Sequence, residues 1–270
     1  MNEKAKELLG KEKYDFTDLC RVMEILRGEG GCPWDREQTH ESIRKNFIEE
    51  TYEVVEAIDT KDAHLLCEEL GDVLLQVVFH TEIEREAGRF TVGDVTDGIV
   101  KKLIYRHPHI FADTAAETAD RGLENWDALK AKEKHRDTVT SSMRAVPRPL
   151  PALMRADKVG KRAAKVGFDF ATARDAAVKI AEETDEVLTA TDATRAEEVG
   201  DLLFAAVNVA RKCGVDPEKA LSDATDKFIN RFEAVENAVR ADGKTMENLP
   251  LSALDAYWDR VKAAGNGENT

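Results

Sequence analysis

The sequence predicts an all-α protein made of two tandem helical bundle domains. Alanine, glutamate, aspartate, lysine, valine and leucine dominate the 270 residues, and only 6% of residues are aromatic, a composition that favours helices over sheets. No segment alternates polar and apolar residues for long enough to indicate a strand. The same short motifs also occur twice in the same order, which indicates a duplicated domain.

Five short blocks recur in both halves of the chain at similar intervals. The most informative ones pair a Glu-Glu-x-x-Glu segment with a later Glu-x-x-Asp segment. The matched blocks are GCPWD (31–35) and VGFD (166–169), FIEETYEVVEAID (47–59) and IAEETDEVLTATD (180–192), EELGDVLLQVV (68–78) and EEVGDLLFAAV (197–207), Lys102 with Arg106 and Lys227 with Arg231, and Trp126-Asp-x-x-Lys130 and Trp258-Asp-x-x-Lys262. Five matches in one order are hard to ascribe to chance.

The boundary between the two copies is predicted at a proline-rich stretch. Three prolines between residues 147 and 151 prevent a helix from continuing through it. The predicted division gives a first domain, a linker, a second domain and a disordered tail: residues 1–140, 141–152, 153–264 and 265–270.

Residues that typically begin or end helices occur along both copies. Asp62 is the expected N-cap of the third helix, and Gly88 and Gly214 are expected helix ends. Asp216-Pro217 predicts the start of a further helix with proline in its first turn. The helices expected in the first copy cover residues 15–27, 41–59, 62–87, 92–105 and 121–135.

Charge and hydropathy exclude several classes of partner. The net charge of −14 argues against nucleic acid as the main partner, because duplex binding needs a basic face. The longest apolar stretch, residues 73–79, is too short to span a bilayer. The charged N-terminal residues lack the apolar core of a signal peptide. The four cysteines form no Cys-x-x-Cys pair, so reduced thiols in a cytoplasmic protein are expected.

Several carboxylates fall where a helix should be apolar. On a helical wheel of residues 43–58, Glu50 lies inside the apolar arc and Glu53 lies at its edge. In the following helix Glu69 and Asp72, three residues apart, share one face with leucine and valine neighbours. The apolar arc around Glu50 is formed by Ile43, Phe47, Val54, Ala57 and Ile58.

Carboxylates gathered on apolar faces predict a bound cation. Burying each carboxylate costs several kcal/mol unless a nearby positive charge compensates, and the negative charges also repel one another. A ligand set made only of oxygens favours Mg²⁺, with Mn²⁺ as a substitute. A single Glu-rich helix usually has a solvated face, but here the paired motifs occur twice. The predicted metal ligands are Glu50, Glu53, Glu69 and Asp72 in the first copy and Glu183, Glu186, Glu198 and Asp201 in the second.

Basic residues distinguish the two copies. Lys227 and Arg231, one helical turn apart, are expected to contact phosphate. Lys179 and Arg195 lie beside the second acidic cluster, whereas the first copy has asparagine and leucine at the matching positions, 46 and 66. The second copy is therefore the expected main active site. Metal binding, a role in assembly and residual activity all remain open for the first copy.

With these motifs the chain resembles the MazG family of nucleoside triphosphate pyrophosphohydrolases, in its two-domain form. The resemblance extends from about residue 17 to residue 262. Besides the two acidic motif pairs, it rests on the segments 31–35, 106–111 (RHPHIF), 166–169 and 201–208 (DLLFAAVN).

The resemblance implies two tandem MazG-like helical bundle domains that dimerise to complete their core. It also implies Mg²⁺-dependent hydrolysis of (d)NTP to (d)NMP and pyrophosphate, in EC 3.6.1.8 or 3.6.1.9, with a house-cleaning role in the nucleotide pool. The expected partners are nucleoside triphosphates and a second copy of the chain. The nucleotide-binding positions that the resemblance implies are Lys179, Glu182, Arg195, Lys227, Arg231 and Trp258.

The expected chemistry is in-line attack of water on the α-phosphorus, with metal-held carboxylates and basic side chains neutralising the polyphosphate. Glu182 and Glu183 are the catalytic candidates, and either could be the general base. Trp258 could stack on the base or ribose. The sequence gives no indication of base or sugar preference.

Four other interpretations compete with this one. A di-iron carboxylate bundle needs Glu-x-x-His pairs, and histidine occupies none of the corresponding positions. An acidic adaptor that binds a basic partner would tolerate Glu→Gln changes and need no metal. A preference for one nucleotide, as in a dUTPase, is the close competitor within the favoured class. His107 and His109 could suggest zinc, but no Cys/His set completes such a site.

Overall fold

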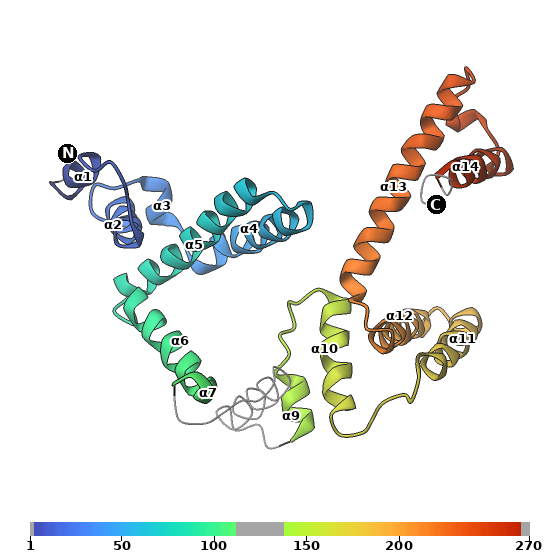
Figure 1. Ribbon diagram of the computed structural model, residues 1–270, viewed down its shortest axis with the longest axis horizontal. Coiled ribbons are helices and arrows are strands. Elements are labelled where there is room, and N and C mark those ends of the chain that lie inside the picture. The colour runs from blue at the N-terminus through green and yellow to red at the C-terminus, as the bar shows by residue number, and fades with distance from the viewer. Residues whose placement is uncertain (1–2, 112–137, 266–270) are drawn as a thin grey trace. The chain divides into compact units, whose positions relative to one another are not determined.

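The computed structural model describes residues 3–111 and 138–265, and within these ranges the regular elements are all helices (Figure 1). The prediction of an all-α fold is therefore confirmed. The chain divides into two compact units, Met1–Lys130 and Ala131–Thr270. Within the described ranges, no helix combines the length and the apolar character needed to cross a bilayer.

The first unit is built around a pair of long helices joined by a two-residue turn. The four predicted helices that fall in its described part are confirmed to within two residues. The fifth, 121–135, lies outside the described residues. The helices of this unit are α1 (Glu3–Leu9), α2 (Phe16–Arg27), α3 (Pro33–Glu37), α4 (His40–Thr60), α5 (Ala63–Glu86), α6 (Val92–Arg106) and α7 (Pro108–Phe111).

Local sequence signals set the ends of these helices. Thr39 begins α4 and Thr91 begins α6, each through a capping box with the residue three positions later. The Asp62 carboxylate accepts hydrogen bonds from the backbone N–H groups of residues 64 and 65 at the start of α5. Gly88 follows α5 with a φ of +68°, a value that glycine adopts without strain. These caps fix where the α4–α5 pair begins and ends.

The second unit repeats this arrangement with α11 and α12 as its central pair (Figure 1). As predicted, Asp216 caps α13, Pro217 is its first residue, and Gly214 ends the preceding helix. The helical elements of this unit are α9 (Val139–Arg144), α10 (Ala152–Ala164), α11 (Ala173–Thr189), α12 (Arg195–Lys212), α13 (Pro217–Ala241), the 3₁₀ turn η1 (Met246–Asn248) and α14 (Leu251–Gly265).

The range predicted as a linker begins inside a helix of the second unit. Residues 141–144 belong to α9, which packs against α10, and the Arg162 guanidinium donates a hydrogen bond to the backbone carbonyl of Ser142. The prolines that motivated the linker lie after this helix. Residues 266–270 of the predicted tail lie outside the described residues.

The buried cores are small, and large apolar side chains remain on the surface. In the first unit Met23, Ile43, Val78 and Phe79 form the core where α2 packs on the α4–α5 pair. Ile58 was expected on the apolar arc of α4 but is exposed, although Ala57 beside it is buried. In the second unit a separate core joins α13 to α14 and contains Val235, Val239 and Tyr257.

Candidate functional site

The first acidic cluster lies where α4 and α5 face each other. Glu50 of α4 and Glu69 and Asp72 of α5 each offer a carboxylate oxygen, and these three atoms lie within 4.8 Å of one another. Glu69 is only 8% exposed, and its Oε2 atom is buried with no hydrogen-bond partner. An unpartnered, buried carboxylate oxygen facing two other carboxylates is what a cation site requires before its ion binds.

The protonation behaviour of this cluster reflects crowding of negative charge. Burial raises the pKa of Glu50, and the charges of Asp72 and Glu53 raise it further. Burial is also the largest cause of the raised pKa of Glu69, followed by the neighbouring Glu53 carboxyl. Glu53 is exposed and lies outside the group of three, but its carboxyl raises the pKa of both Glu50 and Glu69. All the donors are carboxylate oxygens, so the residues fit Mg²⁺ or Mn²⁺.

The second acidic cluster repeats this geometry between α11 and α12. Oxygens of Glu183, Glu186 and Glu198 lie within 4.8 Å of one another. Glu183 is 7% exposed, whereas Glu186 is exposed and Glu198 is half-buried. The charge of Glu183, together with burial, raises the pKa of Glu186. The predicted ligand Asp201 is exposed and lies outside this group, but it lines the same pocket as Glu183.

A lysine accompanies the second cluster. Lys179 Nζ lies 2.6 Å from Glu182 Oε1 and 3.1 Å from Glu183 Oε1, and these hydrogen bonds hold the pKa of Lys179 well above its usual range. The exposed carboxylate of Glu182 therefore forms an ion pair with Lys179. In the first copy the matching residue is the uncharged Asn46. Lys45 of the first copy contacts Glu49 at 2.9 Å, so the copies differ in the lysine that contacts Glu183, the residue that matches Glu50.

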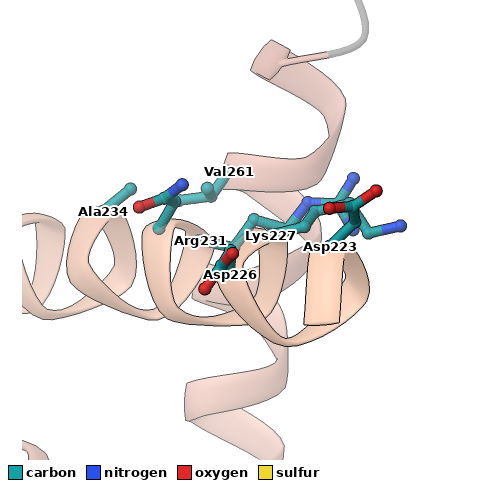
Figure 2. Close-up of a pocket in the computed structure, with 7 residues that line it drawn as sticks. Asp223, Asp226, Lys227, Arg231, Ala234 and Val261 are labelled. Atoms are coloured by element: carbon teal, nitrogen blue, oxygen red, sulfur yellow. The ribbon is translucent and has the colours of Figure 1, made fainter. Parts of the chain in front are cut away.

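Lys227 and Arg231 lie together on α13, at a shallow pocket of about 440 Å³ shared with Val261 of α14 (Figure 2). The side chains of Asp223 and Asp226 also line it. The carboxylates of the second cluster are not among its lining residues. The structure therefore brings the two predicted phosphate ligands together, but at a pocket separate from that of the second cluster.

The other two predicted nucleotide ligands make contacts inside the chain. Arg195 Nη1 lies 2.7 Å from Asp192 Oδ1, three residues earlier. Trp258 packs against the α13–α14 core, and its ring centroid lies 5.2 Å from that of Phe228. His107 and His109 belong to no metal-binding group in the described residues, and the Nδ1 atom of His107 lies 2.7 Å from the carbonyl oxygen of Leu103.

Sequence reasoning missed a second pocket, of about 600 Å³, which opens beside the second cluster. Its wall combines Lys179, Glu183 and Asp201 with residues of α9, α10, α12 and the loop before α11. The side chains that had been assigned no role there are Met143, Val159, Ala163, Phe168, Asp169, Phe170, Phe204, Ala205, Asn208 and Arg211.

An ion pair between distant residues shapes this pocket. Asp169 accepts hydrogen bonds from Arg211 Nη1 at 3.1 Å and from Nη2, and Lys212 Nζ approaches it at 3.2 Å. These partners, Arg211 foremost, hold the pKa of the Asp169 carboxyl well below its usual range. The sequence signal for this ion pair is the Val-Gly-Phe-Asp block at 166–169, which indicates the duplication and the family resemblance but not the partner of Asp169.

The sequence of this chain is similar to those of known proteins. The model of the MazG nucleotide pyrophosphohydrolase domain matches residues 38–111 and again residues 172–236, so it covers both acidic clusters. A nucleoside triphosphate pyrophosphohydrolase/pyrophosphatase MazG of Thermotoga maritima is 45% identical over 248 residues, which are 92% of this chain and 95% of the relative.

Two further relatives carry the same kind of name. A nucleoside triphosphate pyrophosphohydrolase of Escherichia coli K12 is 44% identical over 251 residues, covering 90% of this chain and 95% of the relative. One of Mycobacterium tuberculosis is 34% identical over 250 residues, covering 91% of this chain and 66% of the relative.

Proposed function

The chain belongs to the MazG family of nucleotide pyrophosphohydrolases, and we infer that it is a nucleoside triphosphate pyrophosphohydrolase. Such an enzyme hydrolyses a nucleoside triphosphate to the monophosphate and pyrophosphate. The observation that carries the proposal is the convergence of Glu183, Glu186 and Glu198 beside Lys179. It provides cation ligands and a phosphate-binding ammonium at one place.

We propose that Mg²⁺, with Mn²⁺ as a substitute, binds both acidic clusters. Glu183, Glu186 and Glu198 would hold it in the second copy, with Asp201 close by at the pocket. When bound, the ion neutralises phosphate charge and lowers the pKa of a coordinated water. An acidic pocket would otherwise repel a triphosphate, which carries about four negative charges at neutral pH.

The protein groups supply positioning and charge. The Lys179 ammonium, held 3.1 Å from Glu183, stands where a phosphate oxygen of the substrate can accept a hydrogen bond from it. Glu182, exposed and adjacent, is the proposed acceptor for the proton of the attacking water. Lys227 and Arg231 offer a second pair of phosphate donors. Within one chain, these two donors line a pocket other than the one beside the second cluster.

We propose that a homodimer is the working form. Both central helix pairs expose several large apolar side chains, which a monomer rarely leaves uncovered. A second copy of the chain is the proposed partner, because such side chains would meet in a bundle. These exposed side chains include Tyr52, Val55, Leu70 and Leu74 on α4 and α5, and Val178, Leu188, Leu203 and Phe204 on α11 and α12.

Replacing Leu70 with glutamate is expected to weaken this dimer. The side chain is 51% exposed in the single chain, so the substitution leaves the core of the unit unchanged while placing charge among these exposed apolar side chains. Sedimentation velocity should show the wild type at about twice the mass of the 30.0 kDa chain and the variant shifted toward the monomer. A wild type that sediments as a monomer at micromolar concentration would refute the proposal.

The proposed compartment is the cytoplasm, where thiols remain reduced. Cys20, Cys32, Cys67 and Cys213 are all free in the structure. Their pairing state in protein purified under non-reducing conditions can be counted with a thiol reagent.

The assay that tests the function separates the two possible first products. Purified enzyme is incubated with each nucleoside triphosphate and Mg²⁺, and pyrophosphate and orthophosphate are quantified separately. We expect pyrophosphate and nucleoside monophosphate in equal amounts, with activity lost when EDTA removes the metal. Orthophosphate with nucleoside diphosphate as the first products would place the cleavage between the β and γ phosphates and refute the proposal.

A further inference from the structure

We propose that His40 and His80 form an acid-sensitive latch, which holds the start of α4 against α5 at neutral pH and releases it in mild acid. Both residues lie in the first unit, and neither belongs to an acidic cluster. The proposed reaction uses neither side chain, and the latch does not depend on the proposed function.

The two imidazole rings are in direct contact. His40 is the first residue of α4, and His80 lies in the last two turns of α5. Their Nδ1 atoms are 2.7 Å apart, and the rings are nearly parallel with centroids 5.0 Å apart. A hydrogen bond needs one donor and one acceptor, so only one of these two nitrogens can carry a proton.

The second nitrogen of His40 determines where the protons lie. Its Nε2 atom is 2.5 Å from Glu84 Oε1, and an ionised carboxylate can only accept, so Nε2 carries a proton. Neutral His40 therefore accepts a hydrogen bond at Nδ1 from His80. One added proton reverses this bond, because His40 then donates through Nδ1 and His80 accepts. A second added proton would set two N–H groups and two positive charges face to face, so the closed pair cannot hold it.

The charges around the pair set the pH range. Hydrogen bonds from Arg89, and then from His40, lower the pKa of Glu84 to about 2. Burial, together with the charge of His40, lowers the pKa of His80 below its ordinary value of 6.5. A pKa that is lower in the folded state gives stability at neutral pH that is lost as the pH falls. Between about pH 6.5 and 4.5 the histidines therefore weaken the latch while Glu84 keeps its charge.

Other charged groups near the pair lie on α4 and on the helices packed against α5. On α4, Glu41 follows His40, and Arg44 lies one turn further on. In α2 and α6, which also pack on α5, the acidic and basic side chains pair with other residues. These ion pairs are Asp18 with Lys11, Arg27 with Glu86, and Asp97 with Lys101.

The neighbouring core restricts the opening to the end of the helix pair. Ile43, one turn after His40, belongs to the buried core with Val78 and Phe79. Phe47 of α4 also packs on the His80 ring, with centroids 5.8 Å apart. Release of the latch therefore loosens the first turns of α4, while the core holds the rest of the pair together.

The second copy lacks the latch and serves as an internal reference. Thr39 and Thr172 cap α4 and α11 in the same way, and the EELGD and EEVGD blocks align α5 with α12. On this alignment the residues that match His40, His80 and Glu84 are Ala173, Val209 and Cys213. No imidazole or carboxylate remains at these positions, so mild acid should leave the start of α11 closed.

Hydrogen exchange measured by mass spectrometry on the full chain tests the latch. Residues 44–50, whose amides bond to the first turns of α4, are compared with the matching residues 177–183 of α11. After correction for the intrinsic effect of pH, exchange at 44–50 should increase about tenfold per pH unit below about pH 6.5, because opening takes up one proton. Exchange at 177–183 should stay constant.

A variant that cannot titrate makes the test specific. His80→Asn keeps a hydrogen-bonding group near the position of Nδ1 but takes up no proton, so the acid-induced increase at 44–50 should disappear. His64→Asn replaces an exposed histidine of the same helix and should keep the wild-type response. Circular dichroism at neutral pH checks that both variants fold.

An NMR titration of the wild-type imidazole rings needs no variant. His40 and His80 should titrate as a coupled pair in two well-separated steps. Independent titration of the two rings in one step would overturn the latch. So would unchanged exchange at 44–50 in acid, an equal increase at 177–183, or an undiminished acid response in His80→Asn.

Discussion

Replacing Glu183 with glutamine is expected to lower kcat/KM for nucleoside triphosphates by at least about 10³-fold. This loss corresponds to about 4 kcal/mol of transition-state stabilisation. Glu183 is the most buried member of the second cluster and contacts both the proposed cation position and Lys179. An amide keeps the shape of the side chain but removes the charge that binds the ion.

Two variants of the first copy make this prediction specific. Glu50→Gln changes the matched position of the first cluster and is expected to reduce activity far less than Glu183→Gln. Glu56→Gln removes an exposed carboxylate from the same helix and should leave activity unchanged. Initial rates of pyrophosphate release at saturating Mg²⁺ provide the comparison. Full activity of Glu183→Gln together with loss in Glu50→Gln would move the active site to the first copy.

Replacing Glu69 with glutamine is expected to raise the midpoint of thermal unfolding by a few degrees in metal-free buffer. Oε2 of Glu69 is buried without a partner, and the side chain lies beside the carboxylates of Glu50 and Asp72, so the wild-type side chain destabilises the folded state until a cation binds. The neutral amide relieves the repulsion and can donate a hydrogen bond to its neighbours. Binding of Mg²⁺ to the folded state should stabilise the wild type, and this stabilisation should be weaker in the variant.

Glu56→Gln is the matched control for this measurement. It removes one negative charge from an exposed position of α4 and should change neither the midpoint in metal-free buffer nor the response to Mg²⁺. Differential scanning calorimetry with and without Mg²⁺ gives both quantities. A lowered midpoint in Glu69→Gln combined with an undiminished response to Mg²⁺ would show that the first cluster holds no ion.

The central helices could be predicted from the sequence because their signals are local. Caps at Thr39 and Asp62 and the spacing of apolar residues define α4 and α5 without reference to other elements. The acidic clusters could be predicted for a related reason. Carboxylates on the apolar faces of two consecutive helices meet when those helices pack, as Glu50 and Glu69 do.

Contacts between distant residues could not be predicted in this way. The Val-Gly-Phe-Asp block is visible as a motif, but the pairing of its Asp169 with Arg211, 42 residues later, is not. The pairing of Arg195 with Asp192 was also missed, since either side chain could equally have been directed to solvent or to a ligand. Helical periodicity likewise placed Ile58 on the same apolar arc as Ala57, but only Ala57 is buried.

The ion pairs of Lys179 imply that affinity for substrate depends on affinity for metal. In the structure the ammonium serves as a resident counter-ion for Glu182 and Glu183. Lys179 cannot hold these two carboxylates and a phosphate oxygen at full strength together, so it becomes available to the nucleotide once another cation takes its place. Each ligand should therefore strengthen binding of the other by the same factor. At low concentrations of divalent ions, the enzyme should therefore bind its nucleotide weakly and hydrolyse it slowly.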